Sequence, residues 1–467
     1  MDCAWGEVQL IADMLRKRFK RRTFAHGIHP PEEKWETAGL PIRQFPFSPL
    51  LIVPLCQNIG KPALPVVREG QEVTRGQCIA QPDGVMSVAM HAPASGVVRS
   101  FALAPSISGQ MLPAIYLEPF PSSLQEVTEG VPCRLDTATP AQIIDAIQQA
   151  GLVGLGGAGF PTHVKLRIPP DQYVDTLIIN GVECEPYLTT DHRIMLECPA
   201  DVLTGVGYLQ KATAATRTII AVEANKQDAA DVLQRELTQR SADGHQAASI
   251  RVEVLAVKYP QGAEKMLITA LTGREVPAGG LPLDIHTVCV NVSTAAEIGQ
   301  LLPHGAGLQD RVLTVGGPGV VRKGNYRVPL GTPLRFLLET VGLHRHVTDV
   351  FLGGPMMGQA VPRLDIPVTK GTTGVIVLTD QQTQHPTHQR QYPCIHCGHC
   401  VDACPLFLNP SQLGLLAMRQ RFDEMVQDYH LMDCFECGCC AAVCPSHIPL
   451  VQHFRVAKAA ARKRKLT

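Results

Sequence analysis

The sequence predicts a multidomain α+β protein with four folded parts in 467 residues. Three observations predict this class: a Pro- and Gly-rich N-terminal region with short β-type runs, a central region where β and helical patterns alternate, and two copies of one cysteine spacing near the C-terminus. At roughly 100–200 residues per domain, the length suits three or four domains. An apolar share of 45% and a charged share of 18% are ordinary for globular domains with sizeable cores.

Residues 26–125 predict a small β-sandwich, a barrel-sandwich hybrid of the lipoyl or biotinyl-carrier type. A valine-rich run at 66–73 contains a Glu-Gly turn, a Gly-Gln turn follows at 76–77, and an Ala-Pro-x-Ser-Gly turn leads into a strand near 97. A carrier domain of this type needs a modifiable lysine at the hairpin tip, but residues 86–90 read Met-Ser-Val-Ala-Met. We therefore expect a structural domain here and no swinging arm.

Residues 130–305 predict an α/β domain with a largely parallel sheet, because short apolar runs alternate with helical patterns. Thr139-Pro140 marks a helix start, and Gly151 marks its end. The expected strands are 177–180, 217–222, 251–257 and 287–292, and the expected helices are 199–211, 226–240, 262–272 and 293–302.

Residues 311–380 predict a smaller, β-grasp-like unit with two Gly-Gly-Pro turns around one helix near 332–341. The segment 381–392 is polar, which is typical of a linker. It leads into a helical cysteine-rich domain at about 393–455, with a helix expected between its two cysteine runs.

Each cysteine run has the spacing Cys-x2-Cys-x2-Cys-x3-Cys-Pro, which is the bacterial ferredoxin pattern for [4Fe–4S] clusters. In two-cluster proteins the fourth cysteine of each run serves the other cluster. Structural zinc is the competing interpretation, but zinc sites usually use two Cys-x2-Cys pairs without the third nearby cysteine. We therefore predict two clusters and one-electron transfer. The expected ligand sets are Cys394, Cys397, Cys400 with Cys444, and Cys434, Cys437, Cys440 with Cys404, while Cys439 is expected to be a spectator.

The rest of the composition predicts a cytoplasmic location. The eight other cysteines are scattered without pairing logic, which suits a reducing compartment. No secretory signal opens the sequence, and no apolar run approaches the roughly 18 residues of a membrane span.

Both ends of the chain are basic, although Lys plus Arg and Asp plus Glu both total 42. Residues 1–25 contain Arg-Lys-Arg-Phe-Lys-Arg-Arg, and residues 456–467 form a basic tail. Such clusters can lie against an anionic membrane leaflet or an acidic partner, and the alternative is two solvated ends. The neutral body and the lack of interleaved aromatic residues argue against nucleic acid as a partner.

A glycine-rich loop at 154–159 is the second motif that indicates a functional site. Its sequence Gly-Leu-Gly-Gly-Ala-Gly is followed by Phe160, Pro161 and Thr162, with Lys165 just beyond. A dinucleotide-binding fingerprint follows a strand, whereas this loop follows a helix, so the motif alone is weak. Its glycines would still let a phosphate approach the backbone, with Lys165 as a countercharge. The competing interpretation is a flexible loop.

Polar turns at three expected strand ends strengthen the prediction of a ligand site. Residues 180–186 read Asn-Gly-Val-Glu-Cys-Glu-Pro, residues 259–264 read Tyr-Pro-Gln-Gly-Ala-Glu, and residues 291–294 read Asn-Val-Ser-Thr. Ligands in open α/β sheets sit at the carboxyl ends of strands. Carboxylates and amides placed there can bind ribityl or ribose hydroxyl groups.

These motifs, in this order, are similar to the NADH-oxidising, FMN-binding subunit of respiratory complex I. The longer strings at 154–165 and 179–193, together with Gly-Gly-Pro-Met-Met-Gly at 353–358, resemble the C component of the Rnf (Rsx) electron transport complex over roughly residues 25–450. Leu155 and Ala263 depart from the complex I pattern. The N-terminal sandwich and the second cysteine run also suit the Rnf type.

The resemblance implies bound FMN and NAD(H) in the α/β domain. Phe160 would flank the nicotinamide, and Glu185 would meet the NADH ribose. The residues implied to hold FMN are Gly156, Gly157, Gly159, Lys165, Asn180, Glu183, Gly262, Glu264, Asn291 and Thr294.

The function implied is electron transfer between NADH, FMN and two [4Fe–4S] clusters. The partners implied are the other subunits of a membrane-bound Rnf-type complex, with ferredoxin or flavodoxin oxidoreduction coupled to ion movement, and a peripheral place on the cytoplasmic face of the bacterial inner membrane. One alternative is a soluble NADH-dependent flavin/iron–sulfur reductase of the cobalamin-reductase type, although the N-terminal position of the sandwich argues against it. Another is a non-catalytic adaptor, which the intact glycine loop opposes.

Overall fold

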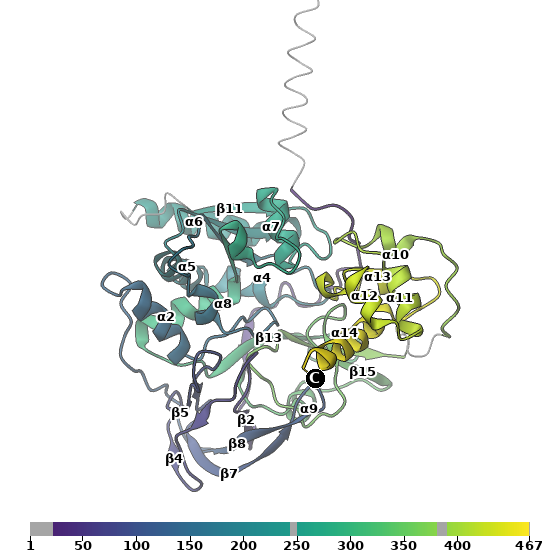
Figure 1. Ribbon diagram of the computed structural model, residues 1–467. Coiled ribbons are helices and arrows are strands. Elements are labelled where there is room, and N and C mark those ends of the chain that lie inside the picture. The colour runs from purple at the N-terminus through teal and green to yellow at the C-terminus, as the bar shows by residue number, and fades with distance from the viewer. Residues whose placement is uncertain (1–21, 243–249, 381–389, 467) are drawn as a thin grey trace, which may run out of the picture.

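The computed structural model describes residues 22–242, 250–380 and 390–466. The β-sandwich lies at the base, the α/β domain at the top and the cysteine-rich helical domain at one side, with a further mixed sheet between them (Figure 1). The basic N-terminal segment falls largely outside the described residues, as does most of the predicted linker at 381–392. Among the described residues, no helix combines the length and apolar character needed to cross a membrane.

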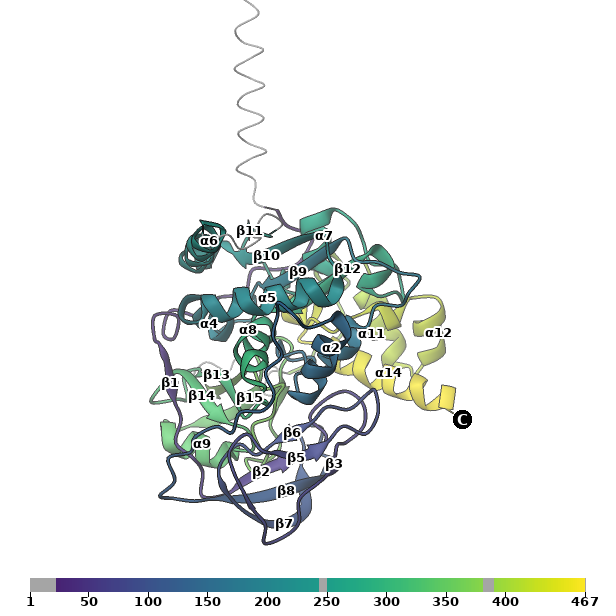
Figure 2. The ribbon, with the colours of Figure 1, turned by 90° about the vertical axis from the view of Figure 1, so that its left-hand side faces the viewer.

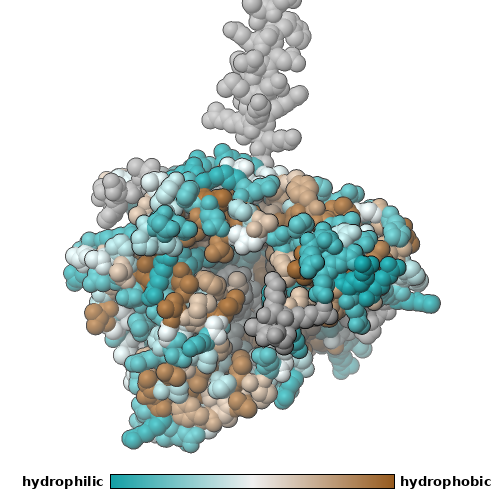
Figure 3. All heavy atoms as spheres, in the orientation of Figure 1, coloured by the Kyte–Doolittle hydropathy of each residue, from teal (hydrophilic) through white to brown (hydrophobic). Residues whose placement is uncertain are grey.

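Two antiparallel sheets form the predicted sandwich. One has the order β2-β8-β7-β4 and the other β3-β5-β6. Alternate residues of β2 and β8, such as Val53 and Ile115, are almost fully buried between the sheets. Apolar side chains also gather on the outer face of this base (Figure 3). Leu103 and Met111 are among the exposed apolar residues of its strands. The strands are β2 (Leu51–Pro54), β3 (Leu64–Pro65), β4 (Glu72–Val73), β5 (Cys78–Gln81), β6 (Met90–His91), β7 (Gly96–Pro105) and β8 (Met111–Pro119).

The central domain has the parallel sheet that the sequence predicts, with helices on both faces (Figure 2). Its order is β11-β10-β9-β12. The strands β9 (Thr176–Gly181), β10 (Arg217–Glu223), β11 (Ile250–Leu255) and β12 (Thr287–Asn291) all overlap their predicted positions. The helices are α2 (Pro140–Gln149), α3 (Thr162–Leu166), α4 (Thr190–Glu197), α5 (Pro199–Thr213), α6 (Gln227–Ala242), α7 (Glu264–Thr272) and α8 (Val292–Leu301).

Local sequence explains where several of these helices begin. Thr139 caps α2 through a capping box with Gln142, and Asn291 caps α8 by accepting from the backbone of Ser293 and Thr294.

The helices α5 and α8 cross closely because Gly205 and Gly299 face each other's backbones. A Cβ at Gly205 would lie 1.7 Å from the carbonyl oxygen of Ala295, so glycine is required there.

The mixed sheet has the order β1-β14-β13-β17-β15-β16 and packs on one helix, α9 (Leu334–Val341). Its first strand, β1 (Ile42–Gln44), comes from the Pro- and Gly-rich N-terminal region and pairs parallel with β14. The N-terminal region therefore contributes to two parts of the molecule. The other strands are β13 (Asp310–Gly316), β14 (Gly324–Pro329), β15 (Val347–Leu352), β16 (Gln359–Ala360) and β17 (Gly374–Thr379).

The cysteine-rich domain is helical as predicted, but the expectation of one helix between the cysteine runs is wrong. Gln420 adopts a left-handed conformation with φ 56° and separates two helices, α11 (Pro410–Met418) and α12 (Phe422–Gln427). The others are α10 (His399–Asp402), α13 (Cys439–Ala442) and α14 (Leu450–Leu466). Most of the predicted basic tail continues α14. Short 3-10 turns occur at Ala224–Lys226, Pro282–Ile285, Leu302–His304 and Leu431–Asp433.

Candidate iron–sulfur and flavin sites

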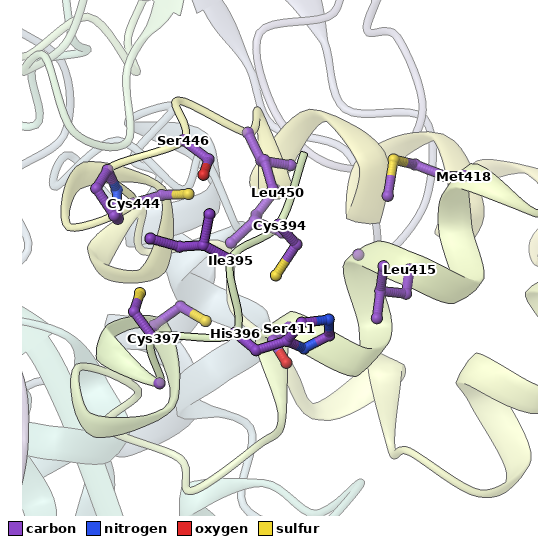
Figure 4. Close-up of a pocket in the computed structure, with 15 residues that line it drawn as sticks. Cys394, Ile395, His396, Cys397, Ser411, Leu415, Met418, Cys444, Ser446 and Leu450 are labelled. Carbon is purple, nitrogen blue, oxygen red and sulfur yellow. The ribbon is translucent and has the colours of Figure 1, made fainter. Parts of the chain in front are cut away.

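The structure brings the cysteines together in the two crossed sets predicted from their spacing. One pocket is lined by Cys394, Cys397, Cys400 and Cys444, and Figure 4 shows sulfur atoms turned toward this space. The second pocket is lined by Cys404, Cys434, Cys437 and Cys440, and also by Cys439, so the role of Cys439 as a spectator stays a prediction. Within the described chain, no three His, Cys, Asp or Glu side chains converge as they would on a single metal ion.

The chemistry of these pockets fits iron–sulfur clusters. Burial raises the pKa of Cys434 to about 11, with the neighbouring thiols of Cys437 and Cys404 adding to the shift. Burial and nearby thiols raise the pKa of Cys440 in the same way. Four thiolates so close together need a compensating positive charge, which an iron core supplies when it binds.

The backbone repeats between the two runs. Gly398 and Gly438 stand before the third cysteine of each run with φ of 83° and 86°. Each starts a short helix, α10 or α13, with its third cysteine in the first turn. The repeat explains why two runs 40 residues apart, counted from Cys394 to Cys434, form similar half-sites.

Two basic side chains of the C-terminal region, those of Lys458 and Arg455, lie next to residues that line the second pocket. Lys458 donates to the backbone carbonyl of Cys434 and to the carboxylate of Glu436 at 3.0 Å. Arg455 donates to the same carboxylate at 2.9 Å. Because the side chain of Lys458 is 8% exposed, the expectation of a solvated end is wrong for this residue.

The predicted flavin residues gather at the switch point of the α/β sheet. After β9 the chain adds β10 and β11 on one side and then crosses to place β12 on the other. A crevice forms beyond the carboxyl ends of the strands at such a point. The glycine loop at 154–159 lies against this edge, because a Cβ at Gly156 would be 3.3 Å from the Asn291 side chain.

The glycine loop is anchored at its ends and exposed in its middle. The backbone N–H of Leu155 donates to the hydroxyl of Thr294 at 3.0 Å, and that of Gly154 donates to the carbonyl of Phe160 at 2.8 Å. Gly156 and Gly157 are exposed. This arrangement leaves the backbone between the anchors open to a ligand phosphate.

Arg311 lies beneath this loop and was not predicted as a site residue. The residue is 1% exposed, and its guanidinium group donates to the carbonyl of Leu155. No partner is found for its Nε and Nη1 atoms within the described chain. Two unpartnered N–H-bearing atoms of a buried cation next to a glycine loop fit an anionic ligand.

Lys165 and Glu264, both predicted to hold FMN, form an ion pair. Lys165 Nζ lies 2.6 Å from Glu264 Oε2 and 2.9 Å from the carbonyl oxygen of Cys289. Burial lowers the pKa of Lys165, but Glu264 and Cys289 together outweigh this effect, so the pKa lies above its ordinary value. Lys165 is therefore a cation at neutral pH, with its side chain one-third exposed.

Other predicted residues make internal hydrogen bonds at the same edge. Asn180 donates to the carbonyl of Gly262 at 2.8 Å. The Glu183 carboxylate accepts from the backbone N–H of Asp191 at 2.9 Å, at the first turn of α4. Asn291 donates to Asp191 at 2.8 Å. These contacts fix the walls of the crevice, and direct contact with FMN stays a prediction for each residue.

Glu185 lies between the backbone of Met356 and Met357 and the side chain of Tyr259. Its carboxylate accepts the backbone N–H groups of Met356 at 3.1 Å and Met357 at 2.9 Å. The Tyr259 hydroxyl lies 3.4 Å from the same carboxylate and donates to the carbonyl of Cys437 at 2.7 Å. Contact between Glu185 and the NADH ribose stays a prediction.

Two buried lysines that the sequence did not single out hold the site together. Lys34 donates to the carbonyls of Glu183 at 2.9 Å, Glu185 at 2.7 Å and Leu188, and burial lowers the pKa of Lys34 to about 8. Lys370 donates to the carbonyls of Ala89 at 2.8 Å and Gly151 at 2.7 Å. No local pattern marks either lysine, because their partners are distant in sequence.

Known protein families match the sandwich, the α/β domain and the cysteine-rich domain. The RnfC barrel sandwich hybrid domain matches residues 22–120, the Nuo51 FMN-binding domain matches residues 147–300, and the 4Fe-4S dicluster domain matches residues 393–448. The fold and the sites thus define an electron-transfer flavoprotein with two iron–sulfur clusters.

Relatives of similar length cover most of the chain. It is 38% identical over 415 residues to the C component of the proton-translocating ferredoxin:NAD(+) oxidoreductase complex of Clostridium ljungdahlii, covering 88% of each chain. It is 38% identical over 453 residues to the C component of the Na(+)-translocating complex of Acetobacterium woodii, covering 94% of this chain and 97% of that one. The C component of the ion-translocating oxidoreductase complex of Pseudomonas aeruginosa is 39% identical, and the match spans 56% of that longer protein. The chain belongs to the RnfC family, the C components of Rnf ion-translocating oxidoreductase complexes.

Proposed function

We propose that this protein exchanges electrons with NAD(H) at an FMN held on the α/β domain and passes them singly through two [4Fe–4S] clusters. The observation that carries this proposal is the direct contact between the two sites, in which Tyr259 beside the sheet edge donates to the carbonyl of the cluster cysteine Cys437. A flavin at that edge would therefore lie beside the dicluster domain.

The residues of the α/β domain would bind FMN, orient the nicotinamide and exclude water. The exposed backbone of Gly156 and Gly157 would receive the FMN phosphate, with Lys165 and Arg311 as nearby positive charges. Phe160 would cover the nicotinamide side. FMN, when bound, exchanges hydride with NAD(H) and single electrons with the clusters.

We further propose that the protein works as a peripheral subunit at the cytoplasmic face of the bacterial inner membrane. Its partners would be the other subunits of an Rnf-type complex, and the overall reaction would couple NAD and ferredoxin or flavodoxin oxidoreduction to ion transport. The relatives named above support this assignment, and they differ in whether the ion is H⁺ or Na⁺.

Cofactor analysis of anaerobically reconstituted protein tests the redox part of the proposal. We expect one FMN and about eight irons per chain, together with NADH-dependent reduction of ferricyanide. Protein that holds the iron but neither flavin nor NADH-dependent activity would contradict it. Co-purification of the native protein with integral membrane subunits tests the second part, and a protein recovered alone from the soluble fraction would favour the soluble-reductase alternative.

A further inference from the structure

The segment 353–358, which we call the GGPMMG loop, lies between the predicted flavin site and the cysteine-rich domain. It connects β15 to β16 and turns tightly, with the backbone N–H of Gly358 donating to the carbonyl of Gly354 at 2.9 Å. A Cβ at Gly354 would lie 2.1 Å from the Glu185 carboxylate. The loop backbone is therefore pressed against this carboxylate, and glycine is required for so close an approach.

Glu185 fixes the position of the loop. Each oxygen of its carboxylate accepts one backbone N–H, from Met356 or Met357. Hydrogen bonds to an ionised acceptor are stronger than those between neutral groups. Burial raises the pKa of Glu185, and the two N–H groups oppose that shift.

The opposite side of the loop touches one of the two cluster-binding runs. A Cβ placed on Gly438 would lie 3.0 Å from the carbonyl oxygen of Met356 and 3.6 Å from its terminal methyl group. Met356 packs in an apolar group that contains Tyr259, Cys437 and Cys439. Met356 thus lies between Glu185 and the loop that carries Cys437.

Other contacts reach the same face of the cysteine-rich domain. The backbone N–H of Gly27 donates to the carbonyl of Ala403 at 3.3 Å, next to Cys404. The backbone N–H of Gly279 donates to the carboxylate of Asp433 at 3.1 Å, next to Cys434. In the other cysteine set, by contrast, Cys397 is exposed. We call the cluster of Cys404, Cys434, Cys437 and Cys440 the near cluster, and that of Cys394, Cys397, Cys400 and Cys444 the far cluster.

We propose that electrons enter the dicluster domain at the near cluster and that Met356, positioned by Glu185, is the side chain that couples this cluster to the flavin site. The inference rests on the proposed function and assigns the order of transfer within it. At each step one electron leaves the reduced flavin and one oxidised cluster accepts it, and no bond forms between them.

The thioether suits this place for two physical reasons. Methionine is flexible and polarizable, so it fills an irregular apolar gap between two domains. By filling the gap it also keeps water from the near cluster, and solvent exposure is one of the factors that set the potential of a cluster. Met356 is therefore a positioning and shielding residue, and Glu185 holds it through the backbone.

The adjacent methionines provide a matched experiment. Met356→Ala opens the gap, whereas Met357→Ala removes a side chain that is 40% exposed and leaves both backbone N–H groups in place. The potentials of both clusters are measured by EPR in a dithionite and mediator titration, and Cys437→Ser identifies the near-cluster signal. We expect Met356→Ala to shift the potential of the near cluster but not of the far cluster, Met357→Ala to shift neither, and Met356→Leu to restore the native value.

Rapid mixing with NADH tests the order of transfer. Freeze-quenched samples of the native protein should show reduction of the near cluster before the far cluster. Met356→Ala should slow this reduction, while the flavin absorbance still bleaches. Equal potentials in both methionine variants, or earlier reduction of the far cluster, would overturn the inference. A native flavin that NADH does not bleach would instead count against the proposed function, and the chemical titration would still decide the role of Met356.

Discussion

Lys34 donates a hydrogen bond to the backbone carbonyl of Glu183, 149 residues further along the chain. The same ammonium group reaches the carbonyls of Glu185 and Leu188. Residues that precede the first strand of the sandwich thus brace the turn that carries Glu183 and Glu185, two of the acids predicted to bind cofactors. Glu32 holds the same turn, because its backbone carbonyl accepts a hydrogen bond from the backbone N–H of Tyr187.

We expect Lys34→Met to loosen this turn and weaken FMN binding. Three carbonyls lose their shared donor, and an unsatisfied buried polar group costs about 1–3 kcal/mol. Urea unfolding should show a loss of this order, and the dissociation constant of FMN should rise in fluorescence titrations. The exposed Lys61 provides the control as Lys61→Met. Equal stability and equal FMN affinity in the two variants would remove Lys34 from the site.

Lys165→Ala tests the predicted phosphate countercharge. Loss of a charge-assisted contact of about 1.5–3 kcal/mol corresponds to a rise of at least about tenfold in the dissociation constant of FMN. Equilibrium dialysis of the apoprotein measures it, and Arg99→Ala is a control that removes an exposed positive charge from the sandwich. Unchanged FMN binding would mean that Lys165 acts solely through its ion pair with Glu264, and would favour the non-catalytic adaptor.

The sequence predicted the chemistry of the cysteine-rich domain more fully than its connections to the rest of the molecule. The ligand sets follow from a fixed local spacing, and the four strands of the α/β sheet follow from apolar runs of ordinary length. The pairing of β1 with β14 and the place of Met356 depend on contacts between distant segments, which leave no periodic signal. The break between α11 and α12 was missed because Gln420 is a residue type that rarely adopts positive φ, and its neighbours carry no glycine or proline.

Cys404→Ser tests the crossed ligand sets. The variant should lose the near cluster and keep about four irons per chain, although Cys404 belongs by sequence to the first run. The double variant Cys404→Ser with Cys437→Ser should lose no more iron than either single variant, whereas Cys404→Ser with Cys397→Ser should lose both clusters. Cys439→Ser is the control and should keep about eight irons. The opposite pattern in the double variants would mean that each run binds its own cluster.

Lys370 predicts a pH dependence of stability at the junction of the sandwich and the α/β domain. Burial lowers the pKa of Lys370 to about 7, and Cys78 opposes part of this shift. Between pH 7 and the ordinary lysine pKa of about 10.4, the unfolded chain holds a proton that the folded chain does not, so this group makes stability rise with pH by up to about 1.4 kcal/mol per unit. Lys370→Met removes the contribution, and the melting temperature of the native protein relative to the variant should therefore rise across this range. A constant difference in melting temperature would show that Lys370 keeps its charge when folded.

The crossed arrangement of the cysteines also constrains how the protein is made. In the crossed ligand sets that we predict, neither set of four sulfurs is complete before Cys440 has been synthesised. The first set needs Cys444, and the second combines Cys434, Cys437 and Cys440 of the later run with Cys404 of the earlier run. These predicted sets would require cluster insertion to follow synthesis of the chain as far as Cys440. A nascent chain that stalls after Cys404 would carry one complete cysteine run and still be unable to assemble either cubane.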